Sequence, residues 1–251
     1  GGGVCNATVF NCTFVSNRAE TGAGGGAHGC VVSNCTFIGN QARSGGGMHG
    51  GTAADCVFDG NIADDYGGGA HDSMIVSCSF GGNSAGNGGG ASGCYVSNSI
   101  FVRNAASGGG GASGDTSYGY VQGHIAYCTV ISNTSSQAGG GLCDVSAERC
   151  VISGNSAQYG GGAFDVDLSN FLLFANSASH SGGGAQYSSF THCTVVGNTA
   201  GFEDGGAYQC YAINSIVVSN TAPSGPNYNS ELGWTFSCSQ PLPSGAGCIS
   251  N

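Results

Sequence analysis

The chain has 251 residues, of which 50 are glycine, and only 7% of its residues are charged. A helical protein is excluded, because each glycine inside a helix costs about 0.5 to 1 kcal/mol relative to alanine. With 14 acidic residues, four basic ones and a net charge of −10, the chain would be repelled by phosphate backbones and anionic lipid head groups. Its longest apolar runs are far shorter than the roughly 20 residues that cross a bilayer. We therefore expect no nucleic-acid partner and no insertion into a membrane.

A block of three glycines recurs along the chain, and an asparagine recurs in step with it. The blocks end at Gly3, Gly26, Gly47, Gly69, Gly90, Gly111, Gly141, Gly162 and Gly184, with Asp204-Gly205-Gly206 as a shortened last member. In nine of the ten repeats the asparagine follows the last glycine by 14 residues, and the next block ends 7 to 9 residues later. A segment of fixed length thus alternates with one of variable length, which we interpret as a loop.

Residues 26–40 show what the fixed segment contains. Three short stretches alternate apolar with polar residues and are broken at Gly29 and Asn34, residue types that tolerate the positive φ of a tight bend. Because alternation with a period of two is typical of strands, the pattern predicts three strands separated by two corners. Ala27, Cys35 and Phe37 belong to three columns that recur in the other repeats: one of small or apolar residues, one mostly of cysteine, and one of large apolar residues. These columns are expected to point inward and form the core.

A short coil of this kind cannot bury its own apolar face and must stack on its neighbours. The sequence therefore predicts an all-β fold, a three-sided parallel β-helix (β-solenoid) of about ten coils of 21–23 residues that covers residues 1–222. Residues 223–251 hold all four prolines and the single tryptophan, which indicates a C-terminal non-repeat segment, either a cap or a continuation. The recurring asparagines are interpreted as a structural ladder of stacked amides: Asn17, Asn40, Asn61, Asn83, Asn104, Asn133, Asn155, Asn176, Asn198 and Asn220.

The repeat resembles a known family. Gly25-Gly26-Ala27, followed by Phe37-Ile38-Gly39-Asn40, is similar to the repeats of polymorphic outer-membrane autotransporter adhesins and of secreted bacterial β-helix repeat proteins. The resemblance implies a right-handed solenoid, export from the cell, and a role at the cell surface or outside the cell. In that family the residue after Gly-Gly-Ala is often aliphatic, whereas here it is His28. The resemblance therefore supports the same architecture but not the same binding chemistry.

Fourteen cysteines raise the question of a disulfide framework. Seven of them occupy one inward column and are interpreted as buried free thiols that pack like small apolar residues: Cys12, Cys35, Cys56, Cys78, Cys128, Cys150 and Cys193. Two pairs are candidates for disulfides. Cys30 and Cys35 flank one corner, and Cys238 and Cys248 close a short loop in the C-terminal segment.

An outward column of histidines is the sharpest chemical feature of the sequence. His28, His49 and His71 follow successive glycine blocks at the same position, and Cys5 precedes them in the same column. Imidazole and thiolate are common ligands of zinc and copper, and several acids crowd the same end of the chain: Asp55, Asp64, Asp65 and Asp72. Ladder side chains point in parallel and need not converge on one ion. We therefore favour a solvated histidine ladder over a metal site and expect no cofactor.

Two further features could serve a ligand or a reaction. An eight-residue insertion carries Tyr118, Tyr120 and Tyr127 and is a candidate ligand-binding loop. Asp144, Asp165 and Asp167 could lie within about 5 Å of one another on adjacent coils, as in retaining glycosidases. Asp144 and Asp165 are explained more simply as residues that suit the bend at a corner between strands. The lysines and arginines that polysaccharide-cleaving β-helices use are almost absent. We assign no catalytic residues and do not expect an enzyme.

These observations favour a non-catalytic rod with a structural or adhesive role, extracellular or at the cell surface. Its expected partner is a surface glycan, a protein, or another copy of the chain stacked end to end in a filament. The filament is suggested by the first coil, which enters at Gly1 already in register with the repeat. The alternative is a carbohydrate-active enzyme, a polysaccharide hydrolase or lyase, on the same fold.

Overall fold

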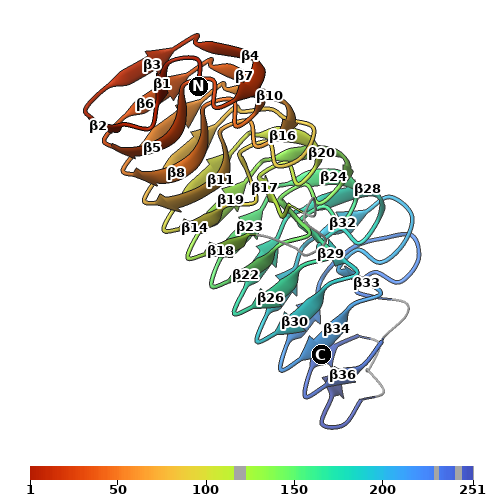
Figure 1. Ribbon diagram of the computed structural model, residues 1–251. Coiled ribbons are helices and arrows are strands. Elements are labelled where there is room, and N and C mark those ends of the chain that lie inside the picture. Colours follow the sequence, from red (N-terminus) through yellow and green to blue (C-terminus); the bar gives the residue numbers. More distant parts are fainter. Residues whose placement is uncertain (116–122, 229–231, 241–244, 251) are drawn as a thin grey trace.

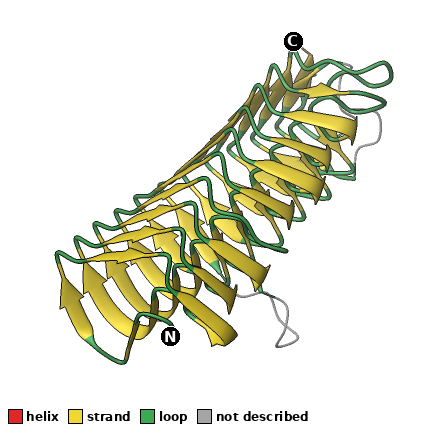
Figure 2. Cartoon of the chain, turned by 90° about the horizontal axis from the view of Figure 1, so that it is seen from above, coloured by secondary structure: helices red, strands yellow, loops and turns green. Residues whose placement is uncertain are grey.

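The computed structural model describes residues 1–115, 123–228, 232–240 and 245–250. Throughout these residues the regular structure is β, with no helix, and the strands stack in parallel along an elongated body (Figures 1 and 2). The predicted β-solenoid of about ten turns is confirmed. Its right-handed winding stays a prediction from the resemblance.

Each coil contributes strands to three walls, which we name sheets A, B and C. Sheet A has 18 strands: β1 (Val4–Cys5), β2 (Thr8–Phe10), β5 (Ala27–Ser33), β8 (Met48–Ala54), β11 (Ala70–Val76), β13 (Ala91–Ser92), β14 (Tyr95–Ser97), β17 (Ala112–Ser113), β18 (His124–Ala126), β21 (Leu142–Cys143), β22 (Ser146–Glu148), β25 (Ala163–Phe164), β26 (Asp167–Ser169), β29 (Ala185–Gln186), β30 (Ser189–Thr191), β33 (Ala207–Tyr208), β34 (Tyr211–Ile213) and β36 (Trp234–Thr235).

Sheet B has 12 strands: β3 (Thr13–Val15), β6 (Thr36–Ile38), β9 (Val57–Asp59), β12 (Ser79–Gly81), β15 (Ile100–Val102), β19 (Thr129–Ile131), β23 (Val151–Ser153), β27 (Leu172–Phe174), β31 (Thr194–Val196), β35 (Ile216–Val218), β37 (Cys238–Ser239) and β38 (Ile249–Ser250). Sheet C has two parts, β4 (Arg18–Ala23), β7 (Gln41–Ser44) and β10 (Ile62–Tyr66), then β16 (Ala105–Gly108), β20 (Thr134–Ala138), β24 (Ser156–Tyr159), β28 (Ser177–Ser181) and β32 (Thr199–Ala200). Single bridges through Ser84 and Asn87 join these two parts.

The segment of variable length is not the loop that its spacing suggests, because it forms the strands of sheet C. Shifts of register absorb its changes in length. Strand β10 pairs with β7 at Ala63 and Ala42, and the next pair is Tyr66 with Ser44, so one extra residue is accommodated between the two pairs. The corner at Gly29 also differs from expectation, since β5, β8 and β11 run through this position, whereas the first coil and the coils after β11 break there into two strands.

The core consists of columns that repeat from coil to coil. Phe14, Phe37, Phe58, Phe80 and Phe101 stack with ring centroids 4.7 to 4.8 Å apart, which is the strand spacing of a sheet. The glycine blocks lie where the coils approach most closely. A Cβ on Gly90, for example, would lie 2.6 Å from the carbonyl oxygen of Gly111 and from a ring carbon of Phe101.

The asparagines form a continuous ladder between these columns. Asn83 is typical: its backbone N–H and its side-chain amide both donate to Oδ1 of Asn104, at 3.0 and 2.9 Å, and the amide also donates to the carbonyl of Phe58. From Asn40 to Asn220 every ladder side chain is buried. Asn227 extends the ladder by accepting from Asn220 and donating to the carbonyl of Gln240.

The C-terminal segment continues the stack. Trp234 pairs with Ala212 in sheet A, and Cys238 pairs with Ile216 in sheet B. The indole of Trp234 is buried and donates to the carbonyl of Cys210.

Candidate functional site

The histidine column is less exposed than the sequence suggests. His28 and His49 are half-buried and His71 is buried, because the turn into each glycine block covers them. Gly67 lies in one such turn, and a Cβ added to it would be only 3.0 Å from the Cβ of His71. The ring of Tyr66 stacks on the imidazole of His71. The expectation of a fully solvated ladder is therefore wrong at His71.

The regular stacking of the column breaks at its last histidine. The rings of His28 and His49 are parallel, with 5° between their planes, whereas those of His49 and His71 are tilted by 57°. The turned ring brings Nε2 of His71 to 3.2 Å from Oδ2 of Asp115 and to 3.6 Å from Oδ1 of Asp72. Nε2 of His49 lies 4.0 Å from Oδ2 of Asp72. We name these four residues the His–Asp cluster.

Local backbone conformation explains how the cluster is built. Asp72 occupies the corner between two strand segments with φ of 50°, a left-handed conformation that aspartate tolerates better than most residues. The corner residue of the next coil is Gly93, and a Cβ there would lie 2.7 Å from Oδ1 of Asp72 and 3.0 Å from Cβ of Asp115. The space between the two carboxylates therefore exists only because Gly93 lacks a side chain.

The electrostatics of the cluster favour a neutral imidazole at His49. Burial lowers the pKa of His49, and the neighbouring His71 lowers it further, so His49 is neutral at pH 7. Three buried atoms of the cluster have no hydrogen-bond partner: Nδ1 of His49, Nδ1 of His71 and Oδ1 of Asp72. Such atoms carry a desolvation cost that a bound ligand could offset.

The structure groups the sequence candidates differently from the prediction. His28 stacks against the far side of His49, and its Nδ1 lies 3.7 Å from the thiol of Cys5. Asp65 binds Arg43 at 2.7 Å instead of approaching the histidines. Asp115 was missed, although its position carries a signal: it follows a corner at an inward position where the two preceding coils have Ser73 and Cys94.

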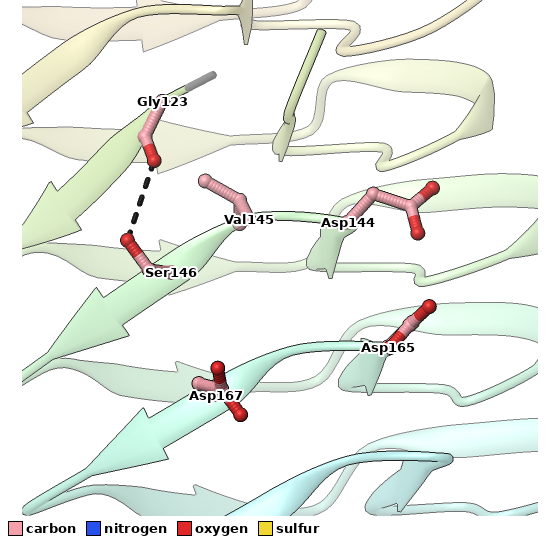
Figure 3. A pocket seen from close by; sticks show the side chains of 6 residues that line it. All are labelled: Gly123, Asp144, Val145, Ser146, Asp165 and Asp167. Carbon is pink, nitrogen blue, oxygen red and sulfur yellow. Dashed lines mark hydrogen bonds between the residues drawn. The ribbon is translucent and has the colours of Figure 1, made fainter. Parts of the chain in front are cut away.

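A second candidate site is an acidic pocket of about 210 Å³ on sheet A, lined by Asp144, Asp165, Asp167, Ser146, Val145 and Gly123 (Figure 3). Asp144 and Asp165 lie one above the other on neighbouring coils, while Asp167 lies on β26 and accepts from Ser189. Burial raises the pKa of Asp165, and repulsion by Asp144 and Asp167 raises it further. Both corner aspartates have φ near 50°, in agreement with a structural role.

The tyrosine loop can be described in part. Tyr118 and Tyr120 lie outside the described residues. Tyr127 is an exposed corner residue with φ of 55°, and the guanidinium of Arg149 lies over its ring, 5.4 Å from the centroid, and donates to its hydroxyl.

All fourteen cysteines are free thiols, so neither the Cys30–Cys35 nor the Cys238–Cys248 disulfide is formed. The Sγ of Cys30 donates instead to the carbonyl of His28, and that of Cys35 to the carbonyl of Ser33. Burial raises the pKa of Cys94 to about 12 and that of Cys193 to about 11. Such thiols stay protonated and unreactive.

A third feature is the outer face of sheet B, which we name the sheet B wall. It consists of the first and third residues of the ten strands from β3 to β35, since the middle residue of each points inward. Of these twenty residues, twelve are Val, Ile, Leu or Phe, seven are Thr, Ser or Gly, and one, Asp59, is charged. Ile100, Leu172 and Ile216 are among its exposed members. Such a continuous apolar face is unusual on a protein that is monomeric in water.

No family model matches the chain, and no curated protein has a significantly similar sequence. The described residues contain no helix long and apolar enough to cross a membrane. The parallel β-solenoid is therefore established by the strand pairing itself.

Proposed function

We propose that this protein is a non-catalytic, adhesive β-solenoid, extracellular or at the cell surface, that associates with a second copy of itself through the sheet B wall. The single observation that carries the proposal is the composition of that wall. The resemblance of the repeat to autotransporter adhesins supports an adhesive role and a location outside the cell.

Charge distribution favours a second copy as the partner. The chain has a net charge of −10, so two copies repel each other over most orientations. The wall contributes little to this repulsion, because Asp59 is its one charged residue. Two walls can therefore meet with little Coulomb repulsion while Val, Ile and Leu side chains leave water.

The size of the wall predicts a weak interaction. Ten strands spaced by about 4.8 Å, each about 10 Å long, give roughly 430 Å² per copy and about 900 Å² for a pair. Specific stable interfaces bury about 1,200 to 2,000 Å² in total. We therefore expect a dimer that forms and dissociates rapidly.

Sedimentation velocity over a wide range of protein concentration tests this association. We expect a monomer–dimer equilibrium that the double variant Ile100→Glu/Leu172→Glu abolishes, because charges from both copies would then face each other across the interface. The matched control Ile62→Glu/Phe202→Glu places the same charges on exposed apolar residues outside the wall and should associate like the parent. An unaltered equilibrium in the wall variant would contradict the proposal. Filaments that persist in this variant would indicate end-to-end stacking instead.

The acidic pocket favours a carbohydrate-active enzyme as the second candidate. Asp165, with its raised pKa, has the property of a general acid, and Asp144 or Asp167 would be the ionised partner. We expect no reducing sugar to be released from neutral or acidic polysaccharides by the parent protein. Hydrolysis that Asp165→Asn removes, and that Asp59→Asn on the sheet B wall does not, would establish the enzyme and overturn the non-catalytic assignment.

A further inference from the structure

The His–Asp cluster combines the donor atoms of a transition-metal site in a small space. Two imidazoles and two carboxylates come from separate coils: His49 from β8, His71 and Asp72 at β11, and Asp115 just beyond β17. His49, His71 and Asp72 each offer one ligand atom, and these three atoms lie within 4.8 Å of one another. Oδ2 of Asp115 is 3.2 Å from Nε2 of His71.

Three separations between these donor atoms are near those of a coordination shell. Four donors bound tetrahedrally at roughly 2.0 to 2.1 Å lie about 3.3 Å from one another. The measured separations are 3.2 Å, 3.6 Å and 4.0 Å. His49, His71 and Asp72 therefore approach the spacing of ligands on one ion, and Asp115 joins them through its contact with His71.

A hydrogen bond from His71 to Asp115 accounts for only part of this arrangement. It leaves Oδ1 of Asp72 buried without a donor, although the imidazole of His71 lies 3.6 Å from it. The side chains of His71 and Asp115 are only 8% and 3% exposed, so water reaches these groups poorly. A cation beside the carboxylate of Asp72 would satisfy its buried oxygen in a poorly solvated place.

From this geometry we infer that His49, His71, Asp72 and Asp115 bind one divalent transition-metal ion, and that Zn²⁺ is the best-matched ion. Imidazole is a poor ligand for Ca²⁺ and Mg²⁺, which prefer sets of oxygen donors. Two nitrogens and two oxygens in a compact shell are typical of zinc and of neighbouring metals.

The site is structural in character. All four ligands come from the protein, which leaves no open position for a substrate on a four-coordinate ion. The ion adds a further link between coils that are already joined by strand pairing and by the stacked side chains of the core, and it holds Asp115 immediately before the insertion. The inference is independent of the sheet B wall, since none of the four ligands belongs to that wall.

Calorimetric titration of the chelator-treated protein with ZnCl2 tests the site. We expect one Zn²⁺ per chain and a rise in melting temperature, because a ligand that binds only the folded state stabilises it. CaCl2 and MgCl2 should cause no rise. The variants His71→Ala and Asp115→Asn should each weaken binding at least ~10-fold, the lower end of what loss of even an outer-shell partner costs.

A control variant separates this site from the other metal donors near it. Cys5 and His28 form a competing pair, so the double variant Cys5→Ser/His28→Ala should bind Zn²⁺ with unchanged affinity. Co²⁺ in the site should show visible absorption of a tetrahedral ion without the near-ultraviolet band of a thiolate ligand.

Three outcomes would overturn the inference. The first is the absence of any Zn²⁺-dependent rise in melting temperature while circular dichroism shows a folded β protein. The second is binding of unchanged strength in both His71→Ala and Asp115→Asn. The third is a thiolate band with Co²⁺ that disappears in the Cys5→Ser/His28→Ala variant. Each is measured on dilute monomer, so none depends on association through the wall.

Discussion

Individual corner residues adopt a left-handed backbone conformation whatever their chemical type. At the corner between sheets A and B, Asn34, Tyr127, Arg149 and His192 all have φ between 51° and 55°. For residues other than glycine and asparagine this costs roughly 1 to 2 kcal/mol. The strands on both sides are held by ladders above and below, so the cost is offset by pairing in the whole stack. Stacking, more than residue preference, determines the corner.

Asp204 is a buried polar residue in a left-handed backbone conformation. It stands where the other coils begin their glycine block, it has φ of 55°, and neither carboxylate oxygen has a partner. Burial, with a further contribution from Glu203, raises its pKa to about 7. Its pKa in the unfolded chain is about 3.9.

The pH dependence of stability should reveal this residue. Because the folded-state pKa is raised, the unfolded chain loses the proton first, so stability falls as the pH rises from about 4 to about 7 and then levels off. Asp204→Gly should remove this loss and gain on the order of 3 kcal/mol more at pH 7.5 than at pH 4, where only the backbone strain is relieved. Urea unfolding of both proteins at the two pH values measures the difference. A gain of equal size at both pH values would mean that strain alone, and not ionisation, is relieved.

At the scale of elements, sheets B and C follow different rules. Every sheet B strand of the regular coils has three residues in unbroken register, such as Phe80 with Phe58 and Phe101. Sheet C tolerates extra residues by shifting its register, as between Ala63 and Tyr66. A residue added to sheet B would turn inward side chains outward, because side chains alternate with a period of two. In sheet C the added residue bulges into solvent.

Single-residue insertions test this difference. One serine inserted between Arg43 and Ser44 gives β7 the length of β10 and should change the free energy of unfolding by no more than about 1 kcal/mol, the range of surface changes. One serine inserted between Val130 and Ile131 should cost several kcal/mol, since it displaces the core column. Melting temperatures of the two proteins provide the comparison. Similar losses in both would show that sheet C is as constrained as sheet B.

At the scale of the whole molecule, the sequence predicts the features that recur in every coil and few of the features that occur once. The fold followed from the constant 14-residue segment and its inward columns. Sheet C was not predicted, because a segment of variable length is also typical of a loop. The extra residues form a bulge, and this becomes visible only once the partner strand is known. The His–Asp cluster was predicted in part, through His49 and His71. Asp115 lies two coils away, and its contact depends on the absent side chain of Gly93, which no spacing along the chain indicates.

The asparagine ladder also gives the molecule a row of side-chain dipoles that point the same way along its axis. Each side-chain amide donates to the next coil and accepts from the previous one, from Asn17 through Asn220 to Asn227. The amide dipoles, about 3.5 D for each peptide-like unit, therefore add head to tail along the axis, and each bond polarises the next. A coil grafted from another solenoid must present its amide in the same sense, oxygen toward the amino end. A coil of opposite polarity would place two carbonyl oxygens face to face and interrupt the row.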